Sequence, residues 1–495
     1  MTGTRFPPHV APLGDMRRLL IVATGVFLLF GIFLSNSVEG LFGYLFITVS
    51  AVLPMFLWAR AGALGLPILP AIGGMYWLYF AVPTLRENYN QLFVIPGDIL
   101  RASATVALFL VAATGSSWLL IKRKNGRPTS GTSNRLDFKQ ASTLIYMGIV
   151  TASLFQLGLA AGWFDGVGSL FGVLRAVLLA PFFIACFLSG YYRAQGQLRH
   201  VSWAIVVGGI TLVLVLSWSS LFLVAGMQYL LALTLGFVVG AKRLPWKILV
   251  PAAAVLFVLH AGKGEMREKY WAYGQNSFPL LEMPVAFTEW FGDGIDAIMT
   301  GDRQTDIFDR ASLLSMLLFV QQLTPDSIPY LGGETYALIG SYFVPRFLEP
   351  DKTATQAGMT LLNIHYALQT EEATRSTAIG WGIVPEAFAN FGYGGVLAAG
   401  LLFGGFAGLF MLMSSGATPL SLNSLIAMTA LVSMTNIEAD AGNLLVTMWQ
   451  SFVAVILVFG VVKLLQPKTK KSTDDNQEYE ISLPIRSANS GRIEK

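Results

Sequence analysis

Charged residues are scarce in this chain, at 13% of 495 residues. Soluble globular domains carry about a quarter of their residues as Asp, Glu, Lys and Arg. A chain with so little charge lacks the polar surface needed to face water on all sides, which excludes an ordinary soluble domain. Apolar residues make up 54% of the sequence, and they recur in runs of about 18 to 22 residues, long enough to cross a bilayer. The composition therefore predicts an all-α, polytopic membrane protein.

Several kinds of site lack the residues that they need. The single cysteine, Cys186, lies inside an apolar run, so no intrachain disulfide can form. There is no His/Cys cluster of the kind that binds zinc, no compact Asp-x-Asp metal motif, and no Gly-x-x-x-x-Gly-Lys-Ser/Thr phosphate loop. The net charge of +4 bears on membrane orientation and does not favour a nucleic-acid partner. We expect no cofactor and no metal.

The apolar runs predict a bundle of about twelve transmembrane helices. The expected spans are 19–37, 41–59, 63–85, 102–121, 140–162, 167–190, 201–218, 220–241, 246–262, 393–413, 419–436 and 443–465. They divide the chain into an N-terminal bundle (1–262), a long loop (263–392), a C-terminal group of spans (393–465) and a polar, disordered tail (466–495). The first run shows no cleavage site of a signal peptide, so we expect it to be retained as a helix.

Basic residues fall on one side of this topology. Starting with the N-terminus inside, the cytoplasmic loops hold Arg60, the basic stretch 122–139, Arg193 and Lys242-Arg243, whereas the short outer turns hold acids such as Glu39. Because Lys and Arg collect on the cytoplasmic side, we expect both termini in the cytoplasm. The long loop then lies outside, in the periplasm of a bacterial inner-membrane protein.

The long loop contains elements of its own. Residues 284–299 predict an amphipathic helix that lies on the membrane surface or on the bundle, with Phe287, Trp290, Phe291, Ile295 and Ile298 on its apolar face. Residues 309–323 predict a second helix, with Asp309 as its N-cap. Packing alone would also explain both helices.

Short polar motifs follow these helices and carry a resemblance. In order, they are Arg310, Thr324-Pro325, Pro-Tyr-Leu-Gly-Gly-Glu-Thr-Tyr at 329–336, Pro345-Arg346, Pro-Asp-Lys at 350–352, Glu386 and Asn-Phe-Gly at 390–392. Over about residues 255–410, this order resembles the bacterial O-antigen or exopolysaccharide repeat-unit polymerases of the Wzy type. The resemblance implies a metal-independent glycosyltransferase outside the inner membrane. Its substrates would be oligosaccharides carried on undecaprenyl pyrophosphate, and a chain-length regulator or export protein would be a further partner.

The implied reaction needs cations and a base. A lipid pyrophosphate leaves with growing negative charge, which fixed cations stabilise, and the arginine fork suits phosphate oxygens. The candidate pyrophosphate-binding residues are Arg267, Arg310, Arg346, Lys352, Arg375 and, within the predicted span 167–190, Arg175. His365, Glu265 and Glu386 are the candidate bases for the attacking hydroxyl. The candidate glycan-binding residues are Tyr330, Tyr336 and Trp271.

Other interpretations remain open for these residues. Arg310 beside Asp309 also fits an ion pair at a helix start, and a lone histidine such as His365 is often structural. A ligase that uses a lipid acceptor would share the same donor. A lipid-linked glycan flippase is a different class, and Arg175 within a span is compatible with it, although the unequal halves of the chain do not favour a carrier. A third alternative is a non-catalytic subunit of an export complex. In such a protein, no single charged residue of the loop would be essential for function.

Overall fold

The protein is a helical membrane bundle. The structure, a computed structural model, describes residues 13–61, 65–86, 95, 97–123, 136–164, 166–241, 245–271, 278–279, 281–300, 313–344, 348–349, 353–374, 379–418 and 420–465. Up to the long loop, the helices are α1 (Leu13–Leu34), α2 (Val38–Arg60), α3 (Ile68–Tyr76), the π-helix η1 (Trp77–Ala81), α4 (Val82–Arg86), α5 (Asp98–Arg123), α6 (Phe138–Ala160), the 3₁₀-helix η2 (Gly168–Leu170), α7 (Phe171–Ala194), α8 (His200–Trp218), α9 (Leu223–Ala241) and α10 (Trp246–Ala261). From the loop onward they are α11 (Lys263–Trp271), α12 (Met283–Thr300), α14 (Leu313–Leu323), α15 (Glu334–Ala337), α16 (Ile339–Tyr342), α17 (Ala357–His365), α18 (Glu371–Thr374), α19 (Ile383–Ser414), α20 (Leu422–Met434) and α21 (Ala441–Leu465).

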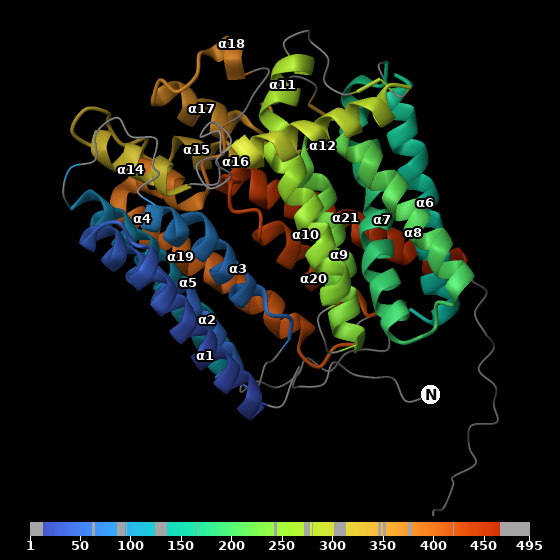
Figure 1. The fold of residues 1–495 in the computed structure, drawn as a ribbon, viewed down its shortest axis with the longest axis horizontal. Coiled ribbons are helices and arrows are strands. Elements are labelled where there is room, and N and C mark those ends of the chain that lie inside the picture. The colour runs from blue at the N-terminus through green and yellow to red at the C-terminus, as the bar shows by residue number, and fades with distance from the viewer. Residues whose placement is uncertain are drawn as a thin grey trace, which may run out of the picture.

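The long helices form two groups joined by the C-terminal helices. Figure 1 shows α1–α5 with α19 on one side of the bundle and α6–α10 on the other. The helix α20 contacts both α3 and α9, and α21 packs against α7, so the last two helices connect the groups. The short helices of the long loop gather at one end of the bundle, which we call the loop end (Figure 1).

Eight of the twelve expected spans are confirmed as helices long and apolar enough to cross a membrane. The other four expected spans coincide with α1, α9, α10 and α20. Their described apolar stretches are shorter, Leu20–Leu34 and Gly226–Ala241 among them, and α10 continues into α11 across a bend of 48°. A multi-pass membrane protein is therefore established within the described residues, while a total of twelve spans stays a prediction.

Glycines bring the main helix pairs into close contact. A Cβ added to Gly404 of α19 would lie 1.9 Å from the Ala113 carbonyl oxygen of α5, and one on Gly236 of α9 would lie 1.9 Å from the Phe187 oxygen of α7. Small residues at these positions let the helix backbones approach, which is how apolar helices associate when lipid removes the hydrophobic driving force between them.

The second half of the loop docks on α5 through polar contacts. Gln321 of α14 donates from Nε2 to the Thr105 hydroxyl (2.8 Å), and Gln322 donates to Asp98 Oδ2 (2.9 Å). Arg101 of α5 donates back to the Gln321 carbonyl oxygen (3.3 Å). The loop is therefore fixed to the start of α5 and not merely laid across it.

The helix α12 confirms the amphipathic helix expected at 284–299 but presents a different face. Its buried residues are Met283, Ala286, Trp290, Gly294 and Ala297, whereas three of the residues expected to be buried with Trp290 are exposed: Phe291, Ile295 and Ile298. Trp290 donates its indole N–H to the Leu259 carbonyl oxygen of α10 (2.7 Å). The small residues of this face, such as Gly294, allow the close approach of α12 to α10. The periodicity of large apolar residues does not indicate such a face. Of the two expected positions, the membrane surface and the bundle, α12 therefore occupies the second.

The expected end of the long loop at 392 falls within a helix. The helix α19 begins at Ile383 and is broken at Phe391 and Gly392, whose backbone angles are not helical. The second expected loop helix begins at Leu313 in the described residues. Asp309, the tail 466–495 and most of the basic stretch 122–139 lie outside them.

Basic helix ends lie away from the loop. Glu39, at the start of α2, accepts hydrogen bonds from Gly97 and Ile99 at the start of α5, so both helices begin at the loop end. They end on Arg60 and on Lys122-Arg123 at the opposite end. This arrangement agrees with the charge pattern on which the expected orientation rests. Which end of the bundle faces the cytoplasm stays a prediction.

Candidate functional site

The break in α19 is filled by the loop motif that carries the resemblance. The backbone N–H groups of Leu331 and Gly332 donate to the carbonyl oxygens of Ala389 (3.0 Å) and Asn390 (3.2 Å). Gly333 N–H donates to the side-chain oxygen of Asn390 (3.1 Å). A broken helix leaves carbonyl groups without intrahelical partners, and the segment 331–333 supplies those partners. Two motifs far apart in sequence thus form one unit, which we call the clasp (residues 329–336 and 386–392).

The clasp requires glycine at its closest point. Gly392 has a φ of +59°, and an added Cβ would lie 2.8 Å from the Tyr330 hydroxyl oxygen. Side-chain-bearing residues rarely adopt this conformation. On the other side of the break, the rings of Tyr336 and Phe391 stack with centroids 6.1 Å apart. The two tyrosines expected to bind glycan therefore flank the break in α19, with Tyr330 41% exposed.

A buried hydrogen-bond chain connects the clasp to α21. Asn390 Nδ2 donates to the Thr335 hydroxyl oxygen (3.0 Å), and Thr335 donates to Glu386 Oε1 (2.9 Å). The other carboxylate oxygen of Glu386 accepts the backbone N–H of Ala441 at the start of α21 (2.6 Å). Glu386 is only 1% exposed. Its carboxylate therefore joins three segments and has no open path to a substrate in this conformation.

A second buried carboxyl group, Asp440, lies beside this chain. Asp440 caps α21 by accepting the Asn443 N–H at Oδ1 (3.0 Å). Its Oδ2 has no hydrogen-bond partner among the described residues, and it faces Gly358 of α17, whose added Cβ would lie 2.6 Å away. Burial raises the pKa of Asp440 above its usual range.

Two tyrosine hydroxyl groups share this environment. Tyr342 of α16 accepts the Gly358 N–H (2.9 Å). Burial, followed by the negative charge of Glu386 and Asp440, raises the pKa of Tyr336, and both carboxylates also act on Tyr342. The phenols and carboxyl groups are therefore close enough to interact electrostatically.

Glu438 extends the acidic surroundings toward the N-terminal bundle. Its backbone oxygen accepts the Gly382 N–H ahead of α19 (3.1 Å). Burial raises the pKa of its carboxyl group, while the charge of Lys263 and a hydrogen bond from Tyr79 of η1 lower it. Glu438 is thus directed to Tyr79 and Lys263, unlike Asp440.

His365 is the candidate base that contacts the clasp and is not fully buried. It lies at the end of α17, partly exposed, and its Nε2 is 3.0 Å from the Pro329 carbonyl oxygen. A carbonyl oxygen only accepts hydrogen bonds, so Nε2 carries the hydrogen and the neutral ring keeps Nδ1 as its basic nitrogen. This tautomer suits proton abstraction from a hydroxyl.

Three other candidates lie apart from the clasp. Arg267 of α11 donates to the Leu221 carbonyl oxygen (3.2 Å) and lies over the Phe222 ring, so its guanidinium makes contacts within the protein. Glu265 is exposed on the same helix, and Arg175 is exposed near the start of α7. Within the described part of the chain, no hydrogen bond or ion pair joins any of these three residues to Glu386, Asp440 or His365.

Four candidate cations are not described by the structure. Arg310, Arg346, Lys352 and Arg375 lie outside the described residues, and the Trp271 side chain does as well. The described chain on either side of them, such as Leu313 of α14, Val344 and Thr374 of α18, belongs to the loop end.

Sequence reasoning missed part of this site. Asp440 and Glu438 were not among the candidate residues, while Thr335 and Asn390 entered only as parts of motifs. Two acids flanking an alanine between apolar helices, at 438–440, were the available signal. Nothing in the sequence indicated that Asp440 would face α17.

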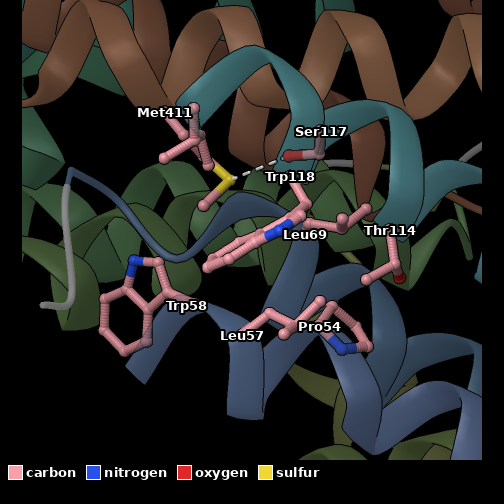
Figure 2. A pocket seen from close by; sticks show the side chains of 9 residues that line it. Pro54, Leu57, Trp58, Leu69, Thr114, Ser117, Trp118 and Met411 are labelled. Carbon is pink, nitrogen blue, oxygen red and sulfur yellow. Dashed lines mark hydrogen bonds between the residues drawn. The ribbon is translucent and has the colours of Figure 1, made fainter. Parts of the chain in front are cut away.

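A small hollow lies at the other end of the bundle. Figure 2 shows side chains of α2, α3, α5 and α19 around an open space of about 240 Å³. Its lining includes Trp58, Trp118 and Met411, with Ser117 directed at the Met411 sulfur (4.0 Å), and it contains no ionisable residue. It has no group for acid–base chemistry.

Within the described residues, no group of three or more His, Cys, Asp or Glu side chains is arranged to hold a metal ion. The clasp, Asp440 and His365 are therefore the candidate site that the structure offers. Comparison of the chain with protein-family models, with curated proteins and with solved structures finds no match.

Proposed function

We propose that the protein is a polysaccharide polymerase that joins oligosaccharide repeat units carried on undecaprenyl pyrophosphate at the periplasmic face of the inner membrane. The observation that carries the proposal is the clasp. Residues 329–336 and 386–392, which carry the resemblance to Wzy-type polymerases, are hydrogen-bonded to each other at the loop end. The partly exposed His365 contacts Pro329 of this unit, so the motifs and a base lie together, as glycosyl transfer at a membrane surface would require.

The proposed reaction uses His365 as the base. Its Nδ1 takes the proton of the acceptor hydroxyl as that oxygen bonds to the anomeric carbon of the growing glycan. The bond from that carbon to the pyrophosphate breaks, and undecaprenyl pyrophosphate leaves with the electron pair. Arg310, Arg346, Lys352 and Arg375 would stabilise the negative charge. Glu386 would position the clasp, because its carboxylate is buried and already accepts two hydrogen bonds.

A reconstituted assay tests this proposal. The purified protein in nanodiscs is mixed with a lipid-pyrophosphate-linked repeat unit, with chelator and without nucleotide. Chain extension is expected. Transfer only to an added lipid acceptor would indicate a ligase, and absence of any transfer would contradict glycosyl transfer altogether.

Matched histidine variants test the base. His365→Ala should reduce extension by about 10²–10⁴-fold. His200→Ala is the control, since His200 is exposed at the start of α8, at the end of the bundle away from the loop. Arg310→Ala and Arg346→Ala should also abolish extension while the protein still inserts in the membrane. Full activity of both arginine variants would remove the phosphate-binding part of the proposal.

The break in α19 supports one alternative, a lipid-linked glycan carrier. Carriers often bind substrate or coupling ions at interrupted helices, and Glu386 and Asn390 lie next to this interruption. Movement of a lipid-linked glycan across vesicles by the purified protein, without any transfer, would support the carrier over the polymerase.

A further inference from the structure

Glu386 and Asp440 are two buried carboxyl groups next to each other in the fold. Each is 1% exposed. Ala441, which donates its N–H to Glu386 (2.6 Å), directly follows Asp440 in the chain, and both carboxylates act on the Tyr336 and Tyr342 hydroxyl groups. Two negative charges so close together and away from water repel each other strongly.

No described cation pairs with either group. The charged and titratable side chains that face the pair are Tyr336 from α15 and Tyr342 from α16, while α17 presents Gly358. Glu438, two residues before Asp440, is directed to Tyr79 and Lys263. Among the described neighbours, nothing with a positive charge offsets the two carboxylates.

The hydrogen bonds distinguish the two members of the pair. Glu386 accepts a hydrogen bond at each oxygen, from Thr335 and from Ala441. Asp440 accepts one at Oδ1, but its buried Oδ2 has no partner among the described residues and points at Gly358. Accepted hydrogen bonds favour an ionised carboxylate. The negative charge of the pair is therefore more stable on Glu386 than on Asp440.

Asp98 shows how the same fold supplies partners to both oxygens of a buried acid. Asp98 is 7% exposed. Its Oδ1 pairs with Arg101 (2.9 Å), and its Oδ2 accepts from the Ile95 N–H (3.1 Å) and from Gln322 (2.9 Å). Asp440 has neither the cation nor the full set of donors.

We propose that Glu386 and Asp440 form a proton-binding site in which the pair holds one proton, on Asp440 Oδ2. The proton removes one of two like charges and needs no more room than the space beside Gly358. A metal ion would need several further ligands around that oxygen. This site is independent of glycosyl transfer and would exist equally in a carrier.

Infrared spectroscopy of the full-length protein in nanodiscs tests the proposal. A protonated carboxyl group gives a C=O band that shifts on exchange into D₂O. We expect such a band at mildly acidic pH, its loss on titration to alkaline pH, and its absence in Asp440→Asn. Asp98→Asn, the matched control, should retain it. A wild-type protein without the band, or an Asp440→Asn protein that keeps it, would overturn the proposal.

Glu386→Gln tests whether the two groups act as a pair. With the neighbouring charge removed, the Asp440 band should titrate at lower pH, and an unchanged midpoint would contradict the pairing. Addition of Na⁺, Mg²⁺ or Ca²⁺ at constant pH should leave the band unchanged. Its displacement by one of these ions would show a cation site in place of the proton site.

Discussion

Thr335 of α15 donates its hydroxyl hydrogen to the buried carboxylate of Glu386 on α19, over 2.9 Å. Thr335 belongs to the long loop and Glu386 to a membrane helix, so the bond crosses the boundary between them. Without the loop, Glu386 would lose one of its two donors and be left with an uncompensated oxygen. The loop is therefore a structural part of the bundle and not an appendage.

Replacing Thr335 by Val should weaken loop docking. The change keeps the side-chain shape but removes both the donor to Glu386 and the acceptor for Asn390. Leaving buried polar groups unsatisfied costs about 1–3 kcal/mol. We expect faster amide hydrogen exchange in α15 and the adjoining segment 330–333, measured by mass spectrometry.

Thr335→Ser is the control for this prediction. Serine keeps the hydroxyl group, so exchange in α15 should stay close to that of the wild type. Equal protection in the Val and Ser variants would contradict a contribution of the hydrogen bond to docking.

Gly392→Ala should destabilise the clasp. The positive φ of Gly392 and the approach of the Tyr330 hydroxyl both oppose a Cβ at this position. Strain of this kind costs about 1–3 kcal/mol, which should lower the unfolding temperature in detergent. Gly394→Ala is the matched control, since an added Cβ there meets nothing within 4 Å. In that helical position alanine should be neutral or stabilising, by at most about 1 kcal/mol. Equal losses in both variants would refute the requirement for glycine at the break.

The sequence predicted the helical membrane class well because low charge and long apolar runs are properties of the chain itself and do not depend on tertiary contacts. It predicted the position of α12 but not its buried face. The contact with α10 uses Gly294 and the indole N–H of Trp290, and apolar periodicity does not register either feature. The broken start of α19 was missed for a related reason, since its freed carbonyl groups are satisfied by residues 331–333 from another part of the chain.

The candidate site was predictable only in part. Glu386 was a candidate as an acid close to an expected span. In the structure it lies between Thr335 of the loop and Ala441 of α21. Its companion Asp440 caps the start of α21. Their proximity results from the tertiary structure, in which α19 packs against α20 and Glu386 accepts the N–H of Ala441. The sequence also offered Glu386 as a candidate base, whereas the structure buries its carboxylate in contacts with Thr335 and Ala441.

Loop docking should weaken as pH rises. Burial raises the pKa of Asp440 above 3.8, its value when unfolded, so the folded protein binds this proton more tightly than the unfolded chain. The resulting stabilisation is complete below the unfolded pKa and is lost as pH rises through the raised, folded pKa. After correction for intrinsic exchange rates, amide protection in α15–α17 should fall over that range. Asp440→Asn should remove the pH dependence. Protection that increases with pH, or the same slope in the variant, would contradict this role of Asp440.

Cysteine labelling should place the loop end outside the cytoplasm. The only native cysteine, Cys186, is buried, so single cysteines introduced elsewhere can be followed in a Cys186→Ala background. Glu334→Cys lies exposed on α15, and Lys122→Cys lies exposed at the opposite end of α5. In spheroplasts, a membrane-impermeant maleimide should modify the cysteine at 334 directly and the one at 122 only after permeabilisation. The reverse pattern would put the clasp and His365 in the cytoplasm. Because the proposed lipid-linked substrates are polymerised at the periplasmic face, that result would contradict the polymerase as well as the orientation.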